Sequence, residues 1–275
     1  MSQVPTITLS HGAEMPRVGL GTSPLNDADA ERSVSTALEL GYRLVDTAEN
    51  YRNEVGVGRA LRGVPRDEVF LTSKFNKRWH SVEGARTAFE ASAEKLGVEY
   101  LDLLLIHWPN PEQDRYVDAW RGLLELREAG LVRAIGTSNF KPAHLQRLID
   151  ETGEAPEVNQ VQLSPVWAKA AEREFHAAHG IVTEAWSPLG KGTDLLSHPT
   201  VQDIAKTHGK APGQVVLRWE TQQDVVPIPK SADRGRLAEN LAVFDFELSP
   251  EELASLTALD GTSTKPAADS DRSGH

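Results

Sequence analysis

Short apolar runs alternate with longer amphipathic stretches along nearly the whole chain. Eight of the apolar runs have the length of buried strands and lie between turn residues. They are residues 18–21, 43–46, 69–74, 101–107, 134–138, 158–163, 181–186 and 225–229. Because amphipathic stretches separate them, the pattern predicts parallel strands that are joined by helical crossovers.

The amphipathic stretches carry residues that begin and end helices. Asn26 can cap a helix over 28–40, which stops at Gly41. Similar signals predict further helices over residues 81–96, 115–129, 198–208 and 212–222 and from residue 249 onward.

The eight strand–helix repeats favour a (β/α)₈ TIM barrel with extra helices over an open, doubly wound sheet. Residues 6–9 and 15–18 flank a turn around Gly12 and predict an N-terminal β-hairpin. We find no internal repeat and no linker, so residues 1–275 are predicted to form one domain. The segment 261–275 has no large apolar side chain, and we expect it to be a mobile tail.

The composition narrows the classes of function. The chain has no cysteine, which excludes disulfides and thiolate metal sites. Its net charge of −11 argues against nucleic acid or an anionic membrane as a partner. No apolar run is long enough to span a bilayer and no secretory signal is visible, so a soluble cytoplasmic protein is expected. His176 and His179 have a metal-ligand spacing on a helix, but no third ligand is apparent, so we interpret them as surface histidines and expect no metal.

Polar side chains follow the predicted strands at their carboxyl ends, which is where barrel proteins usually have their active sites. Asp46, Lys74 and His107 each end an apolar run, and Tyr51 lies in the loop after the first of these runs. The carboxyl ends of barrel strands meet at one rim, so we expect the four side chains to converge. An acid, a phenol, an amine and an imidazole can together protonate a carbonyl oxygen, which allows the carbon to accept hydride.

Each of these side chains can be given a role. Tyr51 would donate the proton, and the Lys74 ammonium is expected to lower the phenol pKa from its ordinary value of about 10. Asp46 would keep Lys74 charged, and His107 would hydrogen-bond the carbonyl oxygen. Any one of these residues alone is explained equally well by a structural role, for example in an ion pair at the barrel rim. Four together on neighbouring strand ends favour catalysis.

Four segments carry a family resemblance: residues 41–54, 104–109, 136–140 and 228–231. They read GYRLVDTAENYRNE, LLIHWP, GTSNF and IPKS, and in this order they resemble the signatures of the aldo-keto reductase family. Residues 115–120 and the short tail are most similar to the bacterial 2,5-diketo-D-gluconate reductase relatives. The resemblance extends from the hairpin to about Asp260. It implies the catalytic roles given above, with Tyr51 as general acid, and a monomer.

A hydride donor requires a binding site, and the chain has no dinucleotide-binding glycine motif. Residues 56–61 match it only in part and lie in a helical stretch, so we interpret their glycines as packing residues. Lys230, Ser231 and Arg236 follow the last strand, where barrels commonly bind phosphate. In isolation, a solvated basic loop is the simpler explanation of these three residues.

The resemblance assigns further residues to a cofactor. It implies NADPH, with Lys230, Ser231 and Arg236 at the 2′-phosphate and a preference over NADH. The other contacts that it implies are Gly21, Thr22 and Asp46 at the nicotinamide end, Ser138, Asn139 and Gln160 at the carboxamide, Trp186 stacked on the ring, Ser187, Leu189 and Gly190 at the pyrophosphate, and Glu239 and Asn240 near the adenine.

The substrate is expected to be a small carbonyl compound. Its pocket would be lined by Tyr51, Trp79, His107 and Trp108. Ser23 and Asn76 stand where many relatives carry aromatic residues, and the C-terminal loop is short and polar. These departures predict an open pocket that suits hydroxylated or dicarbonyl substrates, including keto sugars, better than steroids.

Two other functions fit parts of the pattern. Lys74 could form a Schiff base in a barrel lyase, but Asp46 beside it would keep the amine charged and oppose that chemistry. An NADPH-binding regulatory subunit with little turnover would also retain the four side chains. The leading prediction is an NADPH-dependent reductase of aldehydes, ketones or dicarbonyls.

Overall fold

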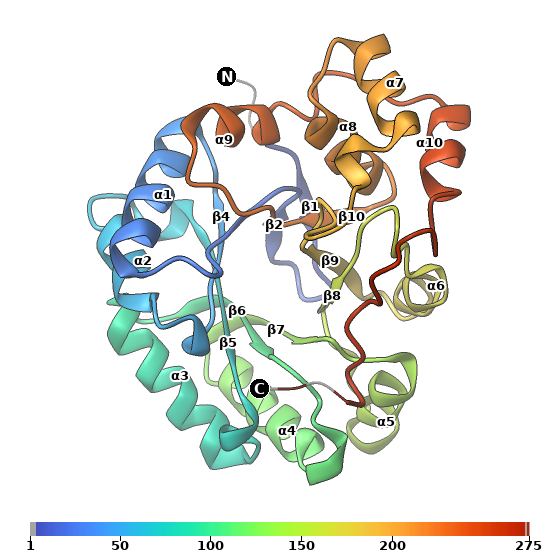
Figure 1. Cartoon of the computed structure of the whole chain (residues 1–275). Helices are drawn as coiled ribbons and strands as arrows, with labels where there is room; N and C mark the ends of the chain where they lie inside the picture. Colours follow the sequence, from blue (N-terminus) through green and yellow to red (C-terminus); the bar gives the residue numbers. More distant parts are fainter. Residues whose placement is uncertain (1–3, 273, 275) are drawn as a thin grey trace.

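The computed structural model describes residues 4–272 and 274, in which eight parallel strands follow one another around a single sheet (Figure 1). The order of the strands in space is their order in sequence, as a (β/α)₈ barrel requires, so the predicted fold is confirmed. The strands are β3 (Leu20–Gly21), β4 (Leu44–Asp46), β5 (Phe70–Phe75), β6 (Leu101–Ile106), β7 (Val132–Ser138), β8 (Val158–Gln162), β9 (Val182–Trp186) and β10 (Val225–Pro227).

Two backbone hydrogen bonds join the first strand of the sheet to the last. The Gly19 N–H donates to the Pro227 carbonyl at 3.0 Å, and the Gly21 N–H donates to the Pro229 carbonyl at 3.2 Å. A Cβ at position 21 would lie 2.8 Å from the carbonyl oxygen of Ile228, so only glycine fits there without a backbone shift. This contact closes the barrel and places the end of β3 against the segment that follows β10.

Helices surround the sheet (Figure 1). They are α1 (Asp27–Leu40), α2 (Glu54–Leu61), α3 (Val82–Leu96), α4 (Tyr116–Glu128), α5 (Pro142–Thr152), α6 (Ala170–Ala178), α7 (Pro199–His208), α8 (Pro212–Thr221), α9 (Arg234–Leu241) and α10 (Pro250–Thr257). The predicted hairpin is also present as the antiparallel pair β1 (Thr6–Thr8) and β2 (Glu14–Pro16). No helix in the described part of the chain combines the length and the apolarity that a membrane span needs.

The predicted helix signals act as expected in α1. The Asn26 side chain accepts a hydrogen bond from the Asp29 N–H at 3.0 Å, and Gly41 ends the helix in the left-handed conformation with a φ of 107°. The glycines of the partial nucleotide motif are packing residues, as predicted. A Cβ on Gly56 would lie 2.1 Å from the Asp27 carbonyl oxygen, and one on Gly58 would lie 2.5 Å from a carbonyl oxygen of α3.

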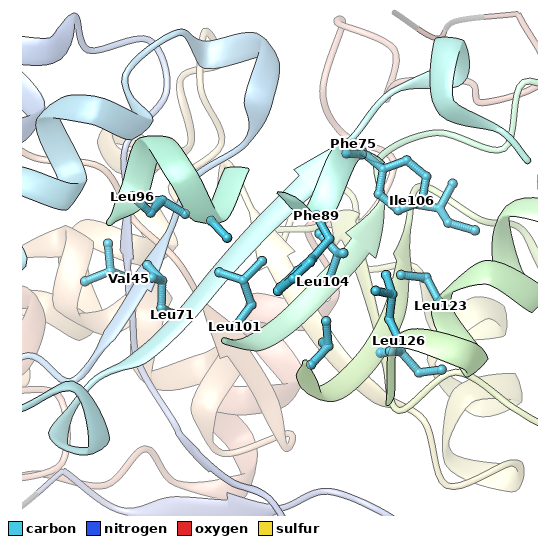
Figure 2. Packing of buried hydrophobic residues seen from close by; sticks show 14 of the residues in the cluster. Val45, Leu71, Phe75, Phe89, Leu96, Leu101, Leu104, Ile106, Leu123 and Leu126 are labelled. Atoms are coloured by element: carbon cyan, nitrogen blue, oxygen red, sulfur yellow. The ribbon is translucent and has the colours of Figure 1, made fainter. Parts of the chain in front are cut away.

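Alternation along the strands divides the core into two layers. In β6, Leu104 and Ile106 point outward and pack with residues of α3 and α4 such as Phe89 and Leu123 (Figure 2). Leu103 and Leu105 instead join the cluster inside the barrel. The same period of two operates in β5, where Phe75 belongs to the outer layer, so its neighbour Lys74 is turned into the barrel.

The segment after Asp260 lies along the rim over β7 and β8. Lys141 forms ion pairs with Asp269, at 2.7 Å, and with Asp271. The Ala268 N–H donates to the side chain of Gln162 at 2.6 Å, and Ser270 is buried. These contacts fix the path of the tail, while its predicted mobility stays a prediction. Of this segment, residues 273 and 275 lie outside the described part.

Candidate active site

The structure brings the four predicted catalytic side chains together at the carboxyl ends of the strands. Asp46 ends β4, Lys74 lies near the end of β5, His107 follows β6, and Tyr51 ends the short helix η1 (Glu49–Tyr51). Lys74 Nζ lies 2.6 Å from Asp46 Oδ1 and 3.4 Å from Tyr51 Oη. The rings of Tyr51 and His107 meet edge to face with centroids 5.8 Å apart.

Lys74 is the cation of this site and has no exposed surface. Its Nζ donates to Asp46, to Tyr51 and to the Thr47 carbonyl oxygen, the last at 2.9 Å. Burial lowers the pKa of Lys74, but attraction to Asp46 and Tyr51 outweighs burial, so the pKa lies above its ordinary value. The amine therefore stays charged, which disfavours the Schiff-base lyase that the sequence left open.

The pKa of Tyr51 corrects one sequence expectation. Burial raises this pKa, and although Lys74 lowers it, the charge of Asp46 acts in the opposite direction, so the net direction is upward. The predicted effect of Lys74 has the right sign, but the prediction of a lowered pKa is wrong. Tyr51 is consequently a firmly protonated phenol at neutral pH, which is the form that a proton donor needs.

A fifth ionisable group, Glu184 of β9, was missed by the sequence analysis. Gln160 Nε2 donates to Asp46 Oδ2 at 2.9 Å and to Glu184 Oε2 at 2.5 Å, so the amide bridges two fully buried carboxyl groups. Burial, with the nearby charge of Asp46, raises the pKa of Glu184 to about 8. This glutamate is therefore mostly a neutral acid at pH 7.

A signal for Glu184 is present in the sequence. It lies two residues before Trp186 in the same strand, so both point to the same side of the sheet. In the register of β8 and β9 it stands directly beside Gln160. A glutamate on the inward side of a buried strand is rare unless its carboxyl group has a partner.

The predicted carboxamide-binding residues form one hydrogen-bonded cluster. Asn139 Nδ2 donates to the His107 carbonyl oxygen and to Ser138 Oγ, both at 3.0 Å. Asn139 Oδ1 accepts from Trp186 Nε1 at 2.9 Å, which fixes the indole of this half-buried tryptophan. Ser138 Oγ in turn donates to the Gln160 carbonyl oxygen at 2.9 Å. The cluster thus holds Trp186 and Gln160 in fixed positions beside the His107 backbone.

Further predicted contacts follow β3 and β9. Thr22 is buried, and its hydroxyl donates to the Asp46 carbonyl oxygen at 2.9 Å. After β9 the chain turns sharply, because the Gly190 N–H donates to the Ser187 carbonyl oxygen at 3.0 Å and both residues have positive φ. Leu189, inside this turn, is half-buried.

The predicted phosphate-binding residues lie between β10 and α9. Lys230 and Arg236 are exposed, whereas Ser231 is buried and its hydroxyl accepts from the Asp233 N–H at 3.1 Å. Asp233 caps α9 and lies 3.9 Å from the Arg236 guanidinium. The patch therefore offers two exposed cations next to a helix N-terminus. The two predicted adenine contacts follow in α9, with one exposed and one buried: Glu239 and Asn240.

The predicted substrate wall is held by a residue that the sequence analysis did not name. Glu49 Oε2 accepts from Trp79 Nε1 and from the Arg78 guanidinium, both at 2.8 Å. Because Glu49 lies in the same short helix as Tyr51, it couples the position of Trp79 to that of the phenol. Trp108 is buried beside His107, with ring centroids 6.4 Å apart.

The prediction of two surface histidines in and after α6 requires a correction at His176. His176 is fully buried, so its interpretation as a surface histidine is wrong. Its ring nitrogens lie 2.9 Å from Asn159 Nδ2 and 2.8 Å from Thr183 Oγ1, which makes it a bridge between α6, β8 and β9. In residues 4–272 and 274, no three His, Cys, Asp or Glu side chains are grouped so that they could hold a metal ion.

Comparison with known proteins identifies the family. The model of the aldo/keto reductase family matches residues 15–261, which is most of the chain. The chain belongs to the aldo/keto reductase family. An aldo-keto reductase of Mycolicibacterium smegmatis is 48% identical over 261 residues, which cover 93% of this chain and 94% of the relative. The 2,5-diketo-D-gluconic acid reductase B of a Corynebacterium species is 47% identical over 94% of this chain and 95% of the relative.

A further relative carries a related name, and two solved structures superpose on this chain. The methylglyoxal reductase DkgA of Yersinia pestis is 46% identical, with 94% of each chain covered. A mutant of Gox0644, whose crystal structure is a complex with NADPH, superposes with a TM-score of 0.95 at 41% identity over the full length of both chains. An aldo-keto reductase of Bombyx mori in complex with NADP superposes with a TM-score of 0.89 at 32% identity, over 95% of this chain and 94% of that one.

Proposed function

We propose that this aldo/keto reductase uses NADPH to reduce small aldehydes, ketones or dicarbonyls, including keto sugars, with Tyr51 as the proton donor. The observation that carries this proposal is the buried chain of contacts from Asp46 through Lys74 to the Tyr51 hydroxyl. A protonated phenol at the barrel rim, with an ammonium behind it and an imidazole beside it, is suited to protonate a carbonyl oxygen.

The residues at the rim fit NADPH. The indole of Trp186 is fixed by Asn139 and is only half-buried, and such a ring suits stacking on a flat partner. Lys230 and Arg236 supply exposed positive charge for a phosphate monoester, and a preference over NADH is expected. The cofactor, when bound, supplies the hydride.

The side chains of the protein then transfer the proton and orient the substrate. Tyr51 Oη gives its proton to the carbonyl oxygen, and the charge that remains on the phenol is stabilised by Lys74 at 3.4 Å. Lys74 is kept charged by Asp46 and does not need to move. His107 lies edge to face with Tyr51 and orients the carbonyl oxygen. The contacts among these four side chains support the roles that we propose for them.

A dicarbonyl substrate is the class that we favour. Two relatives with 46–47% identity are named for 2,5-diketo-D-gluconic acid and for methylglyoxal, both of which carry two carbonyl groups. The rim next to Tyr51 combines Trp79 and Trp108 with the polar side chains of Glu49 and Arg78. This mixture suits a compact polar substrate better than a large apolar one.

A substrate scan tests the proposal. Oxidation of NADPH by the purified chain is followed by absorbance with methylglyoxal, simple aldehydes, keto sugars and a ketosteroid, each with and without protein. We expect turnover of the dicarbonyls to exceed that of the steroid. NADPH binding without turnover of any carbonyl would instead favour the regulatory subunit. We further propose a single-domain monomer, which size-exclusion chromatography with light scattering tests.

A further inference from the structure

Two carboxyl groups share one amide in the interior of the barrel rim, and one of them also contacts a cation. Asp46 and Glu184 are both fully buried, and both accept from Nε2 of Gln160, at 2.9 and 2.5 Å. Lys74 contacts Asp46 at 2.6 Å. The described contacts of Glu184 include no comparable cation, and no hydrogen-bond partner is found in the described residues for its Oε1.

The distribution of contacts determines which carboxyl group keeps a proton. One buried ammonium can balance one carboxylate, and an isolated buried carboxylate is strongly disfavoured. Asp46 has the direct ion pair, so Glu184 is the group that is held neutral. The groups that face it are Asp46 from β4, Lys74 from β5, Tyr51 from η1 and the Gln160 amide from β8.

We propose that Glu184 is a positioning residue that sets the acidity of Tyr51 through the charge of the site. As a neutral acid it leaves the charge of Lys74 to Asp46 and Tyr51. The ammonium then stabilises the phenolate that forms when Tyr51 gives its proton to the carbonyl oxygen of the substrate. When Glu184 is ionised, a second buried negative charge opposes the phenolate and makes Tyr51 a weaker acid. The catalytic consequence rests on the proposed function, whereas the proton on Glu184 does not.

The expected pH range follows from burial and from the neighbouring charge of Asp46, which raise the pKa of Glu184 to about 8. The ionised fraction therefore rises from about one tenth at pH 7 to about nine tenths at pH 9. If only molecules with neutral Glu184 protonate the substrate efficiently, the rate of carbonyl reduction falls by up to about tenfold across this interval. Tyr51 itself stays protonated there, because its pKa lies above the ordinary value.

Infrared spectroscopy tests the proton on Glu184 without cofactor or substrate. The carbonyl stretch of a protonated carboxyl group is recorded for the parent chain and for Glu184→Gln between pH 7 and pH 9. We expect a band that is lost with rising pH in the parent and that is absent from the variant. Buried Glu220 is present in both chains, so any band that it contributes cancels when the two sets of spectra are compared. Identical difference spectra for the two chains would overturn the proposal.

The ratio of rates at pH 9 and pH 7 tests the effect on Tyr51. It is measured for methylglyoxal with the parent, with Glu184→Gln and with Glu184→Leu. Both variants are always neutral, so both should lose the alkaline fall, even if the leucine variant is slower because Gln160 has lost an acceptor. A parent-like fall in either variant would show that charge on Glu184 is not the cause. A chain that reduces no carbonyl would refute the proposed function and the catalytic step together, while the infrared result would still decide whether Glu184 carries the proton.

Discussion

Replacing Lys74 with methionine removes the cation that balances the buried carboxyl groups. Lys74 has no exposed surface, lies 2.6 Å from Asp46, and donates to Thr47 and Tyr51 as well. Removal of one partner from a buried ion pair costs about 3–5 kcal/mol of stability, because the other charge is left without compensation. Since both members of the ion pair are fully buried, we expect the loss of unfolding free energy for Lys74→Met at neutral pH to lie in this range.

The pH dependence of this loss provides a sharper test. Burial raises the pKa of Asp46 in the folded chain above its unfolded value of about 3.9 although Lys74 lowers it, and the substitution removes that opposing effect. A group with a raised folded pKa stabilises the fold fully below the unfolded pKa, and that contribution is lost as the pH rises through the folded pKa. The variant should therefore approach the stability of the parent near pH 4 and differ most from it near pH 8.

Urea unfolding followed by tryptophan fluorescence measures the effect at several pH values. The double variant Lys74→Met with Asp46→Asn is the matched control, because it removes both charges and should recover part of the loss. A loss below about 1 kcal/mol at neutral pH, or a loss that does not change with pH, would refute the buried ion pair on which the assigned chemistry depends.

Three further predictions concern regions away from this pair. Glu220 is fully buried with a raised pKa, and neither carboxyl oxygen has a hydrogen-bond partner in the described residues. Glu220→Met should therefore stabilise the chain by about 1–3 kcal/mol at neutral pH, with a smaller gain below the unfolded pKa of about 4.3, where the parent is protonated in both states. Urea unfolding measures this gain, and a destabilised variant would contradict the prediction. Lys230→Ala with Arg236→Ala should weaken NADPH binding by about tenfold or more and leave NADH binding nearly unchanged, as measured by fluorescence titration; an equal loss for both cofactors would disprove contact with the 2′-phosphate. Lys141→Gln should increase amide hydrogen exchange in residues 265–272 by a few-fold, because it removes two partly exposed ion pairs, and unchanged exchange would mean that other contacts hold the tail.

The sequence was sufficient for the fold because its strands are short, apolar and separated by strong helix signals. Gly41, for example, marks the end of α1 by a conformation that glycine adopts readily, and the structure has it there. Helix α9 was not predicted, since its apolar residues are few. The convergence of Asp46, Lys74 and His107 could be expected because barrel strands end at a common rim.

The parts of the site that were not predicted depend on burial, which a sequence reports only indirectly. The direction of the Tyr51 pKa is decided by desolvation, which outweighs the neighbouring Lys74. Glu184 lies between Thr183 and Ala185 in β9, and its pairing with Gln160 depends on the register of two strands. His176 looks like a polar helix residue, yet the helix turns it toward Asn159 in the core.

The most direct test of the central claim compares the parent chain with Tyr51→Phe. The substitution removes one hydroxyl and retains the ring that lies against His107. NADPH affinity is measured by fluorescence titration, and reduction of methylglyoxal by absorbance under the same conditions. We predict that NADPH binding is retained within about twofold, while kcat falls by about 10²–10⁴. Turnover by the phenylalanine variant close to that of the parent would contradict the assignment of Tyr51 as the proton donor.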